Sequence, residues 1–137
     1  MTVAVAHQVS PTSAKALEEA AREASFRGTR LAIIHVVENL DEDVAAANQA
    51  GISDAVAKVL GDVDLGHVPW ELHLAAGGSQ VPDVAEAILN EVETMKPELL
   101  VIGARRRSPV GKALLGSVAQ TLILDSTVPI LVVKAER

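Results

Sequence analysis

The stretch VIGARRRSPVGKALLGSVAQ, Val101–Gln120, decides how the chain is interpreted. An apolar run typical of a strand ends at Gly103, a basic turn follows, and a helix is expected from Gly116-Ser117. A glycine directly after a strand permits a sharp turn and a close approach of the backbone to a ligand. A helix N-terminus offers free N–H groups and the positive end of the helix dipole. The stretch therefore predicts either a phosphate-binding turn or an ordinary strand–loop–helix connection.

The rest of the chain repeats this alternation of short β-rich runs with segments of helical period. Five runs are predicted strands: Thr2–Ala6, Arg30–Glu38, Val68–Ala76, 98–103 and 130–133. Strands that are apolar on both faces need cover on both faces, and helices between them imply a parallel sheet with right-handed crossovers. We therefore expect one doubly wound, Rossmann-like α/β domain over residues 1–137, with helices on both faces of a five-stranded parallel sheet.

The first two helices are predicted from their end signals. Ser10 is expected as the N-cap of the first helix and Pro11 as its first helical residue. Gly28 is expected to end that helix. Residues 39–62 are acidic and Ala-rich, which predicts a partly helical segment that Gly51 interrupts.

The last two helices are predicted from their apolar period. The segment from Val81 to Met95 keeps apolar residues on one face, and Pro97 stops it. Ser117 is expected to open and cap the last helix, with three apolar residues facing inward: Val118, Leu122 and Ile123.

Composition excludes several classes of protein. The chain has 137 residues, a net charge of −6 and no cysteine. Binding to nucleic acid or to anionic membranes needs a basic face, so neither is expected as a partner. Without cysteine there is no disulfide, thiol catalysis or thiolate metal site. No signal peptide and no run long enough to span a bilayer are recognised, so a cytoplasmic location is expected.

The basic turn itself matches neither common phosphate-loop motif. It is not a Walker A loop, because Gly111-Lys112 is followed by Ala113, and it lacks G-x-G-x-x-G. Four cations nevertheless offer charge-assisted donors to an anion: Arg105, Arg106, Arg107 and Lys112. The alternative is a basic turn that is simply solvated.

The stretch GARRRSPVGKALLGSVAQTLILDSTVPILVVK resembles the C-terminal signature of the universal stress protein family. The family's nucleotide-binding members carry G-x2-G-x9-G-[ST] before a helix and a final apolar strand. Gly103, Gly116 and Ser117 match that motif, whereas Arg106 occupies the position of its second glycine. The similarity extends over essentially the whole chain.

The resemblance implies a fold and a ligand site. It implies the strand order 3-2-1-4-5, with ligands bound beyond the carboxyl ends of the strands, where the order reverses between strands 1 and 4. Carried over residue by residue, the nucleotide contacts are Val36, Ile102, Gly103, Arg105, Gly116, Ser117 and Val118. ATP-binding members usually have Asp-Gly-Ser after the first strand, whereas this chain has Ala6-His7 there and no carboxylate.

Two functions in one family follow from this pattern. One is a regulator or sensor in a stress response that binds ATP or AMP. It does not require the nucleotide as a cofactor. The alternative is a dimeric interaction module that does not bind ATP. In either case the resemblance implies a homodimer through the C-terminal strand, Pro129–Val133, and a regulatory protein partner of unknown identity.

Catalysis and metal binding are not expected. A nucleotide hydrolase needs a general base or a metal ligand near the turn, and only His7 lies beside the predicted pocket, where we expect an exposed loop residue. His67 and His73, six residues apart, are interpreted as surface histidines on one face of a strand because no third ligand lies near them. His35 is interpreted as a hydrogen-bonded core residue.

Overall fold

The computed structural model describes residues 1–7, 11–37, 42–76, 81–106, 113–114 and 116–134. Five strands form a parallel sheet, in the spatial order β3 (Trp70–Ala76), β2 (Arg30–Val37), β1 (Thr2–His7), β4 (Leu99–Arg106) and β6 (Ile130–Lys134). Numbered along the chain, these five strands have the order 3-2-1-4-5, which confirms the predicted topology.

The register of β1 with its two neighbours positions the site. Strands β1 and β2 are paired along their whole common length, from Thr2–Arg30 to His7–His35. Pairing of β1 with β4 ends at Val5–Val101, two residues before β1 ends. The carboxyl ends of β1 and β4 are therefore not joined by ladder hydrogen bonds.

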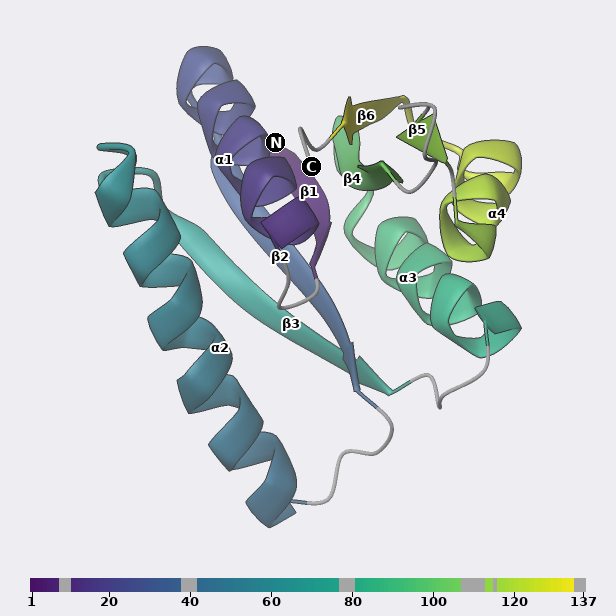
Figure 1. The fold of residues 1–137 in the computed structure, drawn as a ribbon, viewed down its shortest axis with the longest axis horizontal. Helices are drawn as coiled ribbons and strands as arrows, with labels where there is room; N and C mark the ends of the chain where they lie inside the picture. The colour runs from purple at the N-terminus through teal and green to yellow at the C-terminus, as the bar shows by residue number, and fades with distance from the viewer. Residues whose placement is uncertain (8–10, 38–41, 77–80, 107–112, 115, 135–137) are drawn as a thin grey trace.

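Four helices cover the two faces of the sheet (Figure 1). Alternate residues of a strand point to opposite faces, so each strand contributes to both layers. On one face α1 (Pro11–Arg27) and α2 (Glu42–Asp62) enclose a core that includes Val3, Val5, Leu31 and Ile33. On the other face α3 (Val81–Met95) and α4 (Ser117–Asp125) enclose a core that includes Ala4, Ala32, Ile34, Leu100 and Ile102.

Helix α1 packs on the sheet through small residues. Ala16, Ala20, Ala21 and Ala24 are fully buried together with Leu17. With only a methyl group at four of these five positions, the axis of α1 can lie close to β1 and β4, with which it makes its most extensive contacts.

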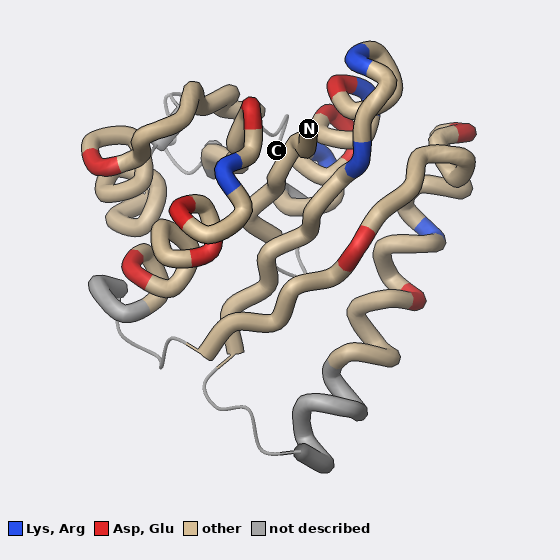
Figure 2. Tube along the Cα trace, turned by 180° about the vertical axis from the view of Figure 1, so that it is seen from behind, with Lys and Arg blue, Asp and Glu red and all other residues tan. Residues whose placement is uncertain are grey.

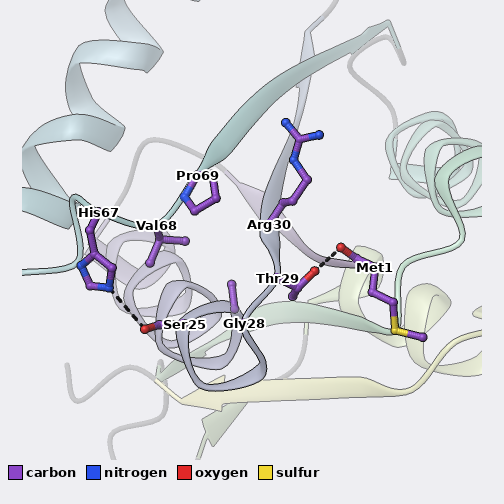
Figure 3. A pocket seen from close by; sticks show the side chains of 9 residues that line it. Met1, Ser25, Gly28, Thr29, Arg30, His67, Val68 and Pro69 are labelled. Atoms are coloured by element: carbon purple, nitrogen blue, oxygen red, sulfur yellow. Dashed lines mark hydrogen bonds between the residues drawn. The ribbon is translucent and has the colours of Figure 1, made fainter.

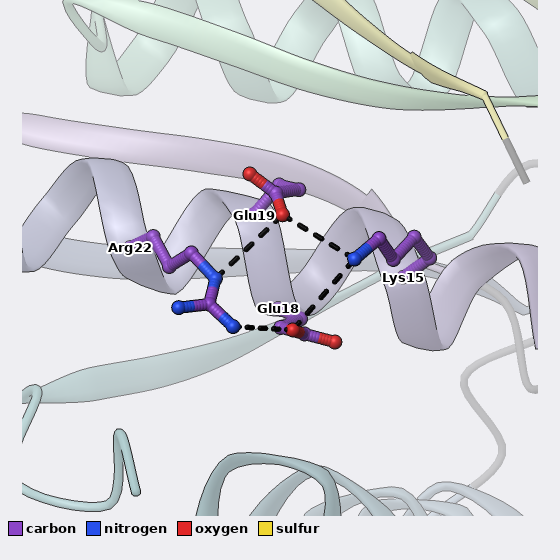
Figure 4. Close-up of polar contacts among 4 residues, drawn as sticks. All are labelled: Lys15, Glu18, Glu19 and Arg22. Atoms are coloured by element: carbon purple, nitrogen blue, oxygen red, sulfur yellow. Dashed lines mark hydrogen bonds and ion pairs between the residues drawn. The ribbon is translucent and has the colours of Figure 1, made fainter. Parts of the chain in front are cut away.

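The outer face of α1 carries a ladder of charges (Figure 4). Lys15 lies 3.8 Å from Glu18 and 3.5 Å from Glu19, and Arg22 contacts the same two carboxylates. Pairs at i,i+3 and i,i+4 on an exposed helix contribute about 0.2–0.5 kcal/mol each. Charged residues elsewhere also lie on helices and near strand ends (Figure 2). The ladder stabilises α1 locally, whereas the two apolar layers stabilise the fold.

Gly51 does not interrupt α2, contrary to the sequence-based expectation. The helix is continuous from Glu42 to Asp62. A glycine in a helix interior costs roughly 0.5–1 kcal/mol relative to alanine. Burial of Ile52, Val56 and Leu60 on the same helix outweighs that cost, because each buried side chain of this size contributes about 1.5–3 kcal/mol.

Helix α3 has its predicted bounds, and α4 begins at Ser117 as predicted but turns a different set of residues toward the core. Helix α3 runs from Val81 to Met95 as predicted. In α4 the buried residues are Ala119 and Leu122, while Ile123 is 40% exposed and was wrongly expected to face inward. The inward stripe of this short helix runs through Ala119 and Leu122, at i and i+3, which leaves Ile123 at the edge of the stripe. Within the described ranges, no helix is both long enough and apolar enough to cross a membrane.

Candidate functional site

The carboxyl ends of β1 and β4 form the point at which the strand order reverses. From β1 the chain continues to β2 on one side, whereas β4 lies on the other side of β1. Crossover connections leave such a point in opposite directions, and ligands of sheets of this kind bind beyond the strand ends there. The predicted contact residues lie in β2, in β4 and at the start of α4, all of which meet this end of the sheet.

Strand β4 does not end at Gly103 as predicted but continues to Arg106. Beyond Gly103 the chain pairs with a short strand, β5 (Ala113–Leu114), in which Leu114 is opposite Arg105 and Ala113 is opposite Arg106. This antiparallel pairing gives the backbone of Arg105 and Arg106 a partner, which explains why the strand extends. The side chains of these two arginines, and residues 107–112, lie outside the described part of the chain.

The hairpin returns the chain to the start of α4. Gly116 follows Leu114 by two residues and is the N-cap of α4, with φ −68° and ψ 167°. Ser117 is the first helical residue, so its predicted role as N-cap is wrong. A glycine N-cap has no side-chain acceptor for the first N–H groups of the helix, and no side-chain cap hydrogen bond is formed there. A helix N-terminus of this kind favours an external acceptor such as a phosphate oxygen.

The apolar contact residues share one side of the sheet. Ile102 is buried, and Val36 and Val118 are half-buried against the same core, the one beneath α3 and α4. Ala6 packs on that core too. The structure therefore brings together the apolar and the helix-terminal parts of the predicted site around the ends of β1, β2 and β4.

On the opposite side of the sheet, the ends of β1 and β2 bring two histidines together. His7 and His35 are register partners, and their Nδ1 atoms lie 3.4 Å apart. His7 is 6% exposed, which corrects the expectation of an exposed loop residue, because β1 extends one residue further than predicted. Burial, with a smaller contribution from His35, lowers the pKa of His7 to about 4, and burial also lowers the pKa of His35. Both rings are therefore neutral at pH 7.

Comparison with known proteins shows which family has this arrangement. Residues 1–134 match the family model described as the universal stress protein family. The chain belongs to this family. A universal stress protein of Mycolicibacterium smegmatis is 36% identical over 133 residues, covering 96% of both chains.

Solved structures of family members have the same fold. The structure of a universal stress protein from Archaeoglobus fulgidus superposes with a TM-score of 0.76 at 27% identity, over 98% of each chain. A structure of the universal stress protein from the same organism, in complex with dAMP, superposes with a TM-score of 0.71 at 23% identity, also over 98% of each chain. The resemblance inferred from the sequence is thus confirmed for the family and for the fold.

The histidine pair was missed by sequence reasoning, although a signal for it was present. His7 is the sixth residue of TVAVAH and His35 the sixth residue of RLAIIH, the first six residues of two neighbouring parallel strands. Once Thr2 is aligned with Arg30, the two histidines must be opposite each other. The hydrogen bond predicted for His35 agrees with this contact, but His35 is half-buried and not a core residue, and its partner was not foreseen.

The other two histidines lie away from the carboxyl ends of β1 and β4. His67 precedes β3 and is not on one strand face with His73, as had been expected. It lines a hollow of about 410 Å³ near the start of β2, together with Ser25, Gly28 and Arg30 (Figure 3). His73 lies 3.5 Å from Glu71. Across the described residues, no three or more His, Cys, Asp or Glu side chains gather as a metal-binding group.

Proposed function

We propose that this member of the universal stress protein family is a regulator or sensor that binds an adenine nucleotide, ATP or AMP, and has no catalytic activity of its own. The observation that supports this most is the open N-terminus of α4, where Gly116 leaves the first N–H groups without a capping side chain. The dipole of the helix favours an anion at this end. Val36 and Val118, half-buried nearby, offer an apolar surface to the rest of the ligand.

The comparison with relatives supports the class of ligand. The family member from Archaeoglobus fulgidus was solved in complex with dAMP. An adenine nucleotide combines a phosphate, which suits the α4 N-terminus, with a base that suits apolar side chains. The proposal places both parts at the ends of β1 and β4.

A second function, a dimeric interaction module without ATP, is favoured by two residues. Arg106 occupies the position of the second glycine in the family's nucleotide motif. His7 is near the position where ATP-binding members have aspartate, and it faces the α1–α2 side of the sheet. In this alternative the carboxyl ends of β1 and β4 bind no nucleotide and the protein acts through its surfaces.

Thermal unfolding with millimolar ATP, AMP or sulfate tests the first function. A ligand at 100-fold its Kd stabilises the native state by about 2.7 kcal/mol. Sulfate separates a general anion site from a nucleotide site, because it lacks base and ribose. If none of the three raises Tm, the interaction module becomes the better description.

Ser117→Ala tests the same site with little effect on folding. Ser117 is exposed and makes no cap hydrogen bond, so we expect the free energy of unfolding to change by no more than about 0.5 kcal/mol. ATP binding, measured by titration calorimetry, should weaken if the hydroxyl contacts phosphate. Thr121→Ala is the matched control, since it removes a hydroxyl one turn further along α4, where Thr121 donates to the Ser117 carbonyl. Equal ATP affinity in all three proteins would contradict a phosphate at Ser117.

A further inference from the structure

We propose that the contact between His7 and His35 is an acid-sensitive device, which holds the carboxyl ends of β1 and β2 together at neutral pH and releases them in mildly acidic solution. The two side chains have no role in the proposed function. The device does not depend on a bound nucleotide, so it can be tested without one.

The histidine contact tolerates only a limited number of protons. The two Nδ1 atoms lie 3.4 Å apart, and the ring centroids are 5.5 Å apart with planes inclined by 49°, so the rings approach through their nitrogen edges. A neutral imidazole carries a proton on one nitrogen and accepts with the other, so one Nδ1–H can donate to the other Nδ1 while at least one ring is neutral. When both rings are protonated, two N–H groups and two positive charges face each other. The hydrogen bond is weak at this length, so the repulsion outweighs it.

A positive charge on either ring lies in an unfavourable place. His7 is 6% exposed and His35 is half-buried. Alternate residues of a strand face opposite sides of the sheet, so both rings lie on the α1–α2 side with Val5 and Ile33. A buried charge is costly unless an opposite charge pairs with it. Among the described residues, no ion pair includes either histidine.

The described charged groups of the neighbouring elements are directed elsewhere. Every charged side chain of α1 takes part in an ion pair that does not include the two histidines (Figure 4). On β3, Glu71 and His73 alternate with Leu74, the register partner of His35, and therefore lie on the other face of the sheet. On α2, Asp54 is exposed, and Lys58 pairs with Asp62 at the exposed surface. Six further charged side chains near these strand and helix ends in sequence lie outside the described part of the chain: Glu38, Asp41, Glu42, Asp43, Arg105 and Arg106.

The end of β1 is placed so that it can open locally. Pairing of β1 with β4 ends at Val5–Val101, whereas pairing with β2 continues to His7–His35. The last two residues of β1 are thus held in the sheet from one side, while Val3 is held from both. Segments with fewer ladder partners open at a lower free energy than the centre of a sheet. Loss of the histidine contact therefore releases the ends of β1 and β2 without unfolding the whole sheet.

The direction of the pH dependence follows from burial. Burial, with a smaller contribution from His35, lowers the pKa of His7 to about 4, whereas a solvated histidine has a pKa of about 6.5. The open form therefore takes up a proton at a higher pH than the closed form does. The closed form is most favoured above about pH 6.5, and opening becomes easier as the pH falls from there to about pH 4. Between pH 7 and pH 5, His7 alone should raise the opening constant about 20-fold, and burial of His35, which also lowers its pKa, acts in the same direction.

Hydrogen exchange of the wild-type backbone amides, measured by NMR at pH 7 and pH 5 without nucleotide, tests the proposal. The protection factors of His7 and Val36, at the carboxyl ends of β1 and β2, should fall about 20-fold or more between the two pH values. Those of Val3 and Ala32, near the amino ends of the same two strands, should fall clearly less. An equal fall at both ends, or no fall at His7 and Val36, overturns the proposal.

The double variant His7→Asn/His35→Asn tests whether the histidines are the groups that titrate. Asparagine places an amide near the position of Nδ1 but does not titrate, so the extra loss of protection at Val36 in acid should disappear. The control is His67→Asn/His73→Asn, which replaces the other two of the four histidines and should keep the acid dependence of the wild type. The proposal is overturned if the first variant keeps that dependence, which would assign it to other groups, or if the control loses it. Where the first variant does not fold, the wild-type comparison of the two strand ends decides.

Discussion

Gly28 ends α1 in the left-handed region of backbone conformation, with φ 67°. The turn around it is closed by Gly28 N–H donating to the Ser25 carbonyl and Thr29 N–H donating to the Ala24 carbonyl. A Cβ at position 28 would meet no atom within 4 Å. The cost of a side chain there is therefore the strain of a left-handed backbone conformation, not a steric clash with neighbouring atoms. Gly28→Ala should therefore lower the free energy of unfolding by about 1–2 kcal/mol in urea titrations.

Gly51→Ala is the matched control for this substitution. Gly51 lies inside α2, has no positive φ, and also has open space around its missing Cβ. The same change should here raise the free energy of unfolding by roughly 0.5–1 kcal/mol. Two destabilised variants, or two stabilised ones, would contradict the role given to the backbone angle of Gly28.

Single residues were predictable where a local rule determines them. Gly28 was identified as a helix end because a glycine directly after an apolar helical period is typical of a C-terminal stop. The N-cap of α4 was misplaced by one residue, since Gly116 and Ser117 are both acceptable caps and only the path of the hairpin decides between them. The burial of His7 depends on β1 extending to residue 7, where it pairs with β2, and no pattern within β1 alone indicates that extension.

At the scale of elements, α4 is anchored by few side chains. Leu122 is 1% exposed and packs in the core beneath α3 and α4, whereas Leu124 is 81% exposed. Leu122→Ala should cost about 2–5 kcal/mol of unfolding free energy, because it leaves a cavity as well as losing burial. Leu124→Ala removes the same atoms from the same helix and should change stability by no more than about 0.5 kcal/mol. Comparable losses in both variants would show that α4 does not pack as described.

Strands and helices with a strong hydrophobic period were predicted from the sequence. Elements whose existence or length depends on tertiary contacts were not. The bounds of α3 followed from its apolar spacing. Strand β5 has two residues and exists because the end of β4 offers it a partner, so no pattern in Ala113–Leu114 could indicate it. The continuity of α2 through Gly51 likewise depends on packing that local propensity does not contain.

At the scale of the whole molecule, the alternation of elements was enough to predict a parallel sheet with two helical layers. The order of its strands came from the family resemblance, because several orders satisfy the same pattern of apolar runs. That order puts β6 at an edge, and among the described residues its strand partner is β4.

We propose that two copies of the chain pair through β6. An apolar edge strand with open backbone groups tends to find a partner, and two-fold pairing of the strand with itself would satisfy those groups. Ile130, Leu131 and Val132 are each half-buried in the single chain and would lose further exposure. Sedimentation at tens of micromolar should show a species of twice the chain mass of 14.3 kDa. A single species at the chain mass would refute pairing through β6.

The central position of β1 has a consequence for synthesis on the ribosome. The segment from β1 to β3 emerges first, and it contains three neighbouring strands together with the two helices of one face. Until α3, β4 and α4 follow, the opposite face with Ala4, Ala32 and Ile34 is bare, and one edge of β1 lacks its neighbour. Bare apolar faces and unpaired edges attract chaperones and other nascent chains. Stalled nascent chains that have emerged from the ribosome as far as residue 76 should therefore bind a holdase, and chains that have emerged beyond the last strand should not.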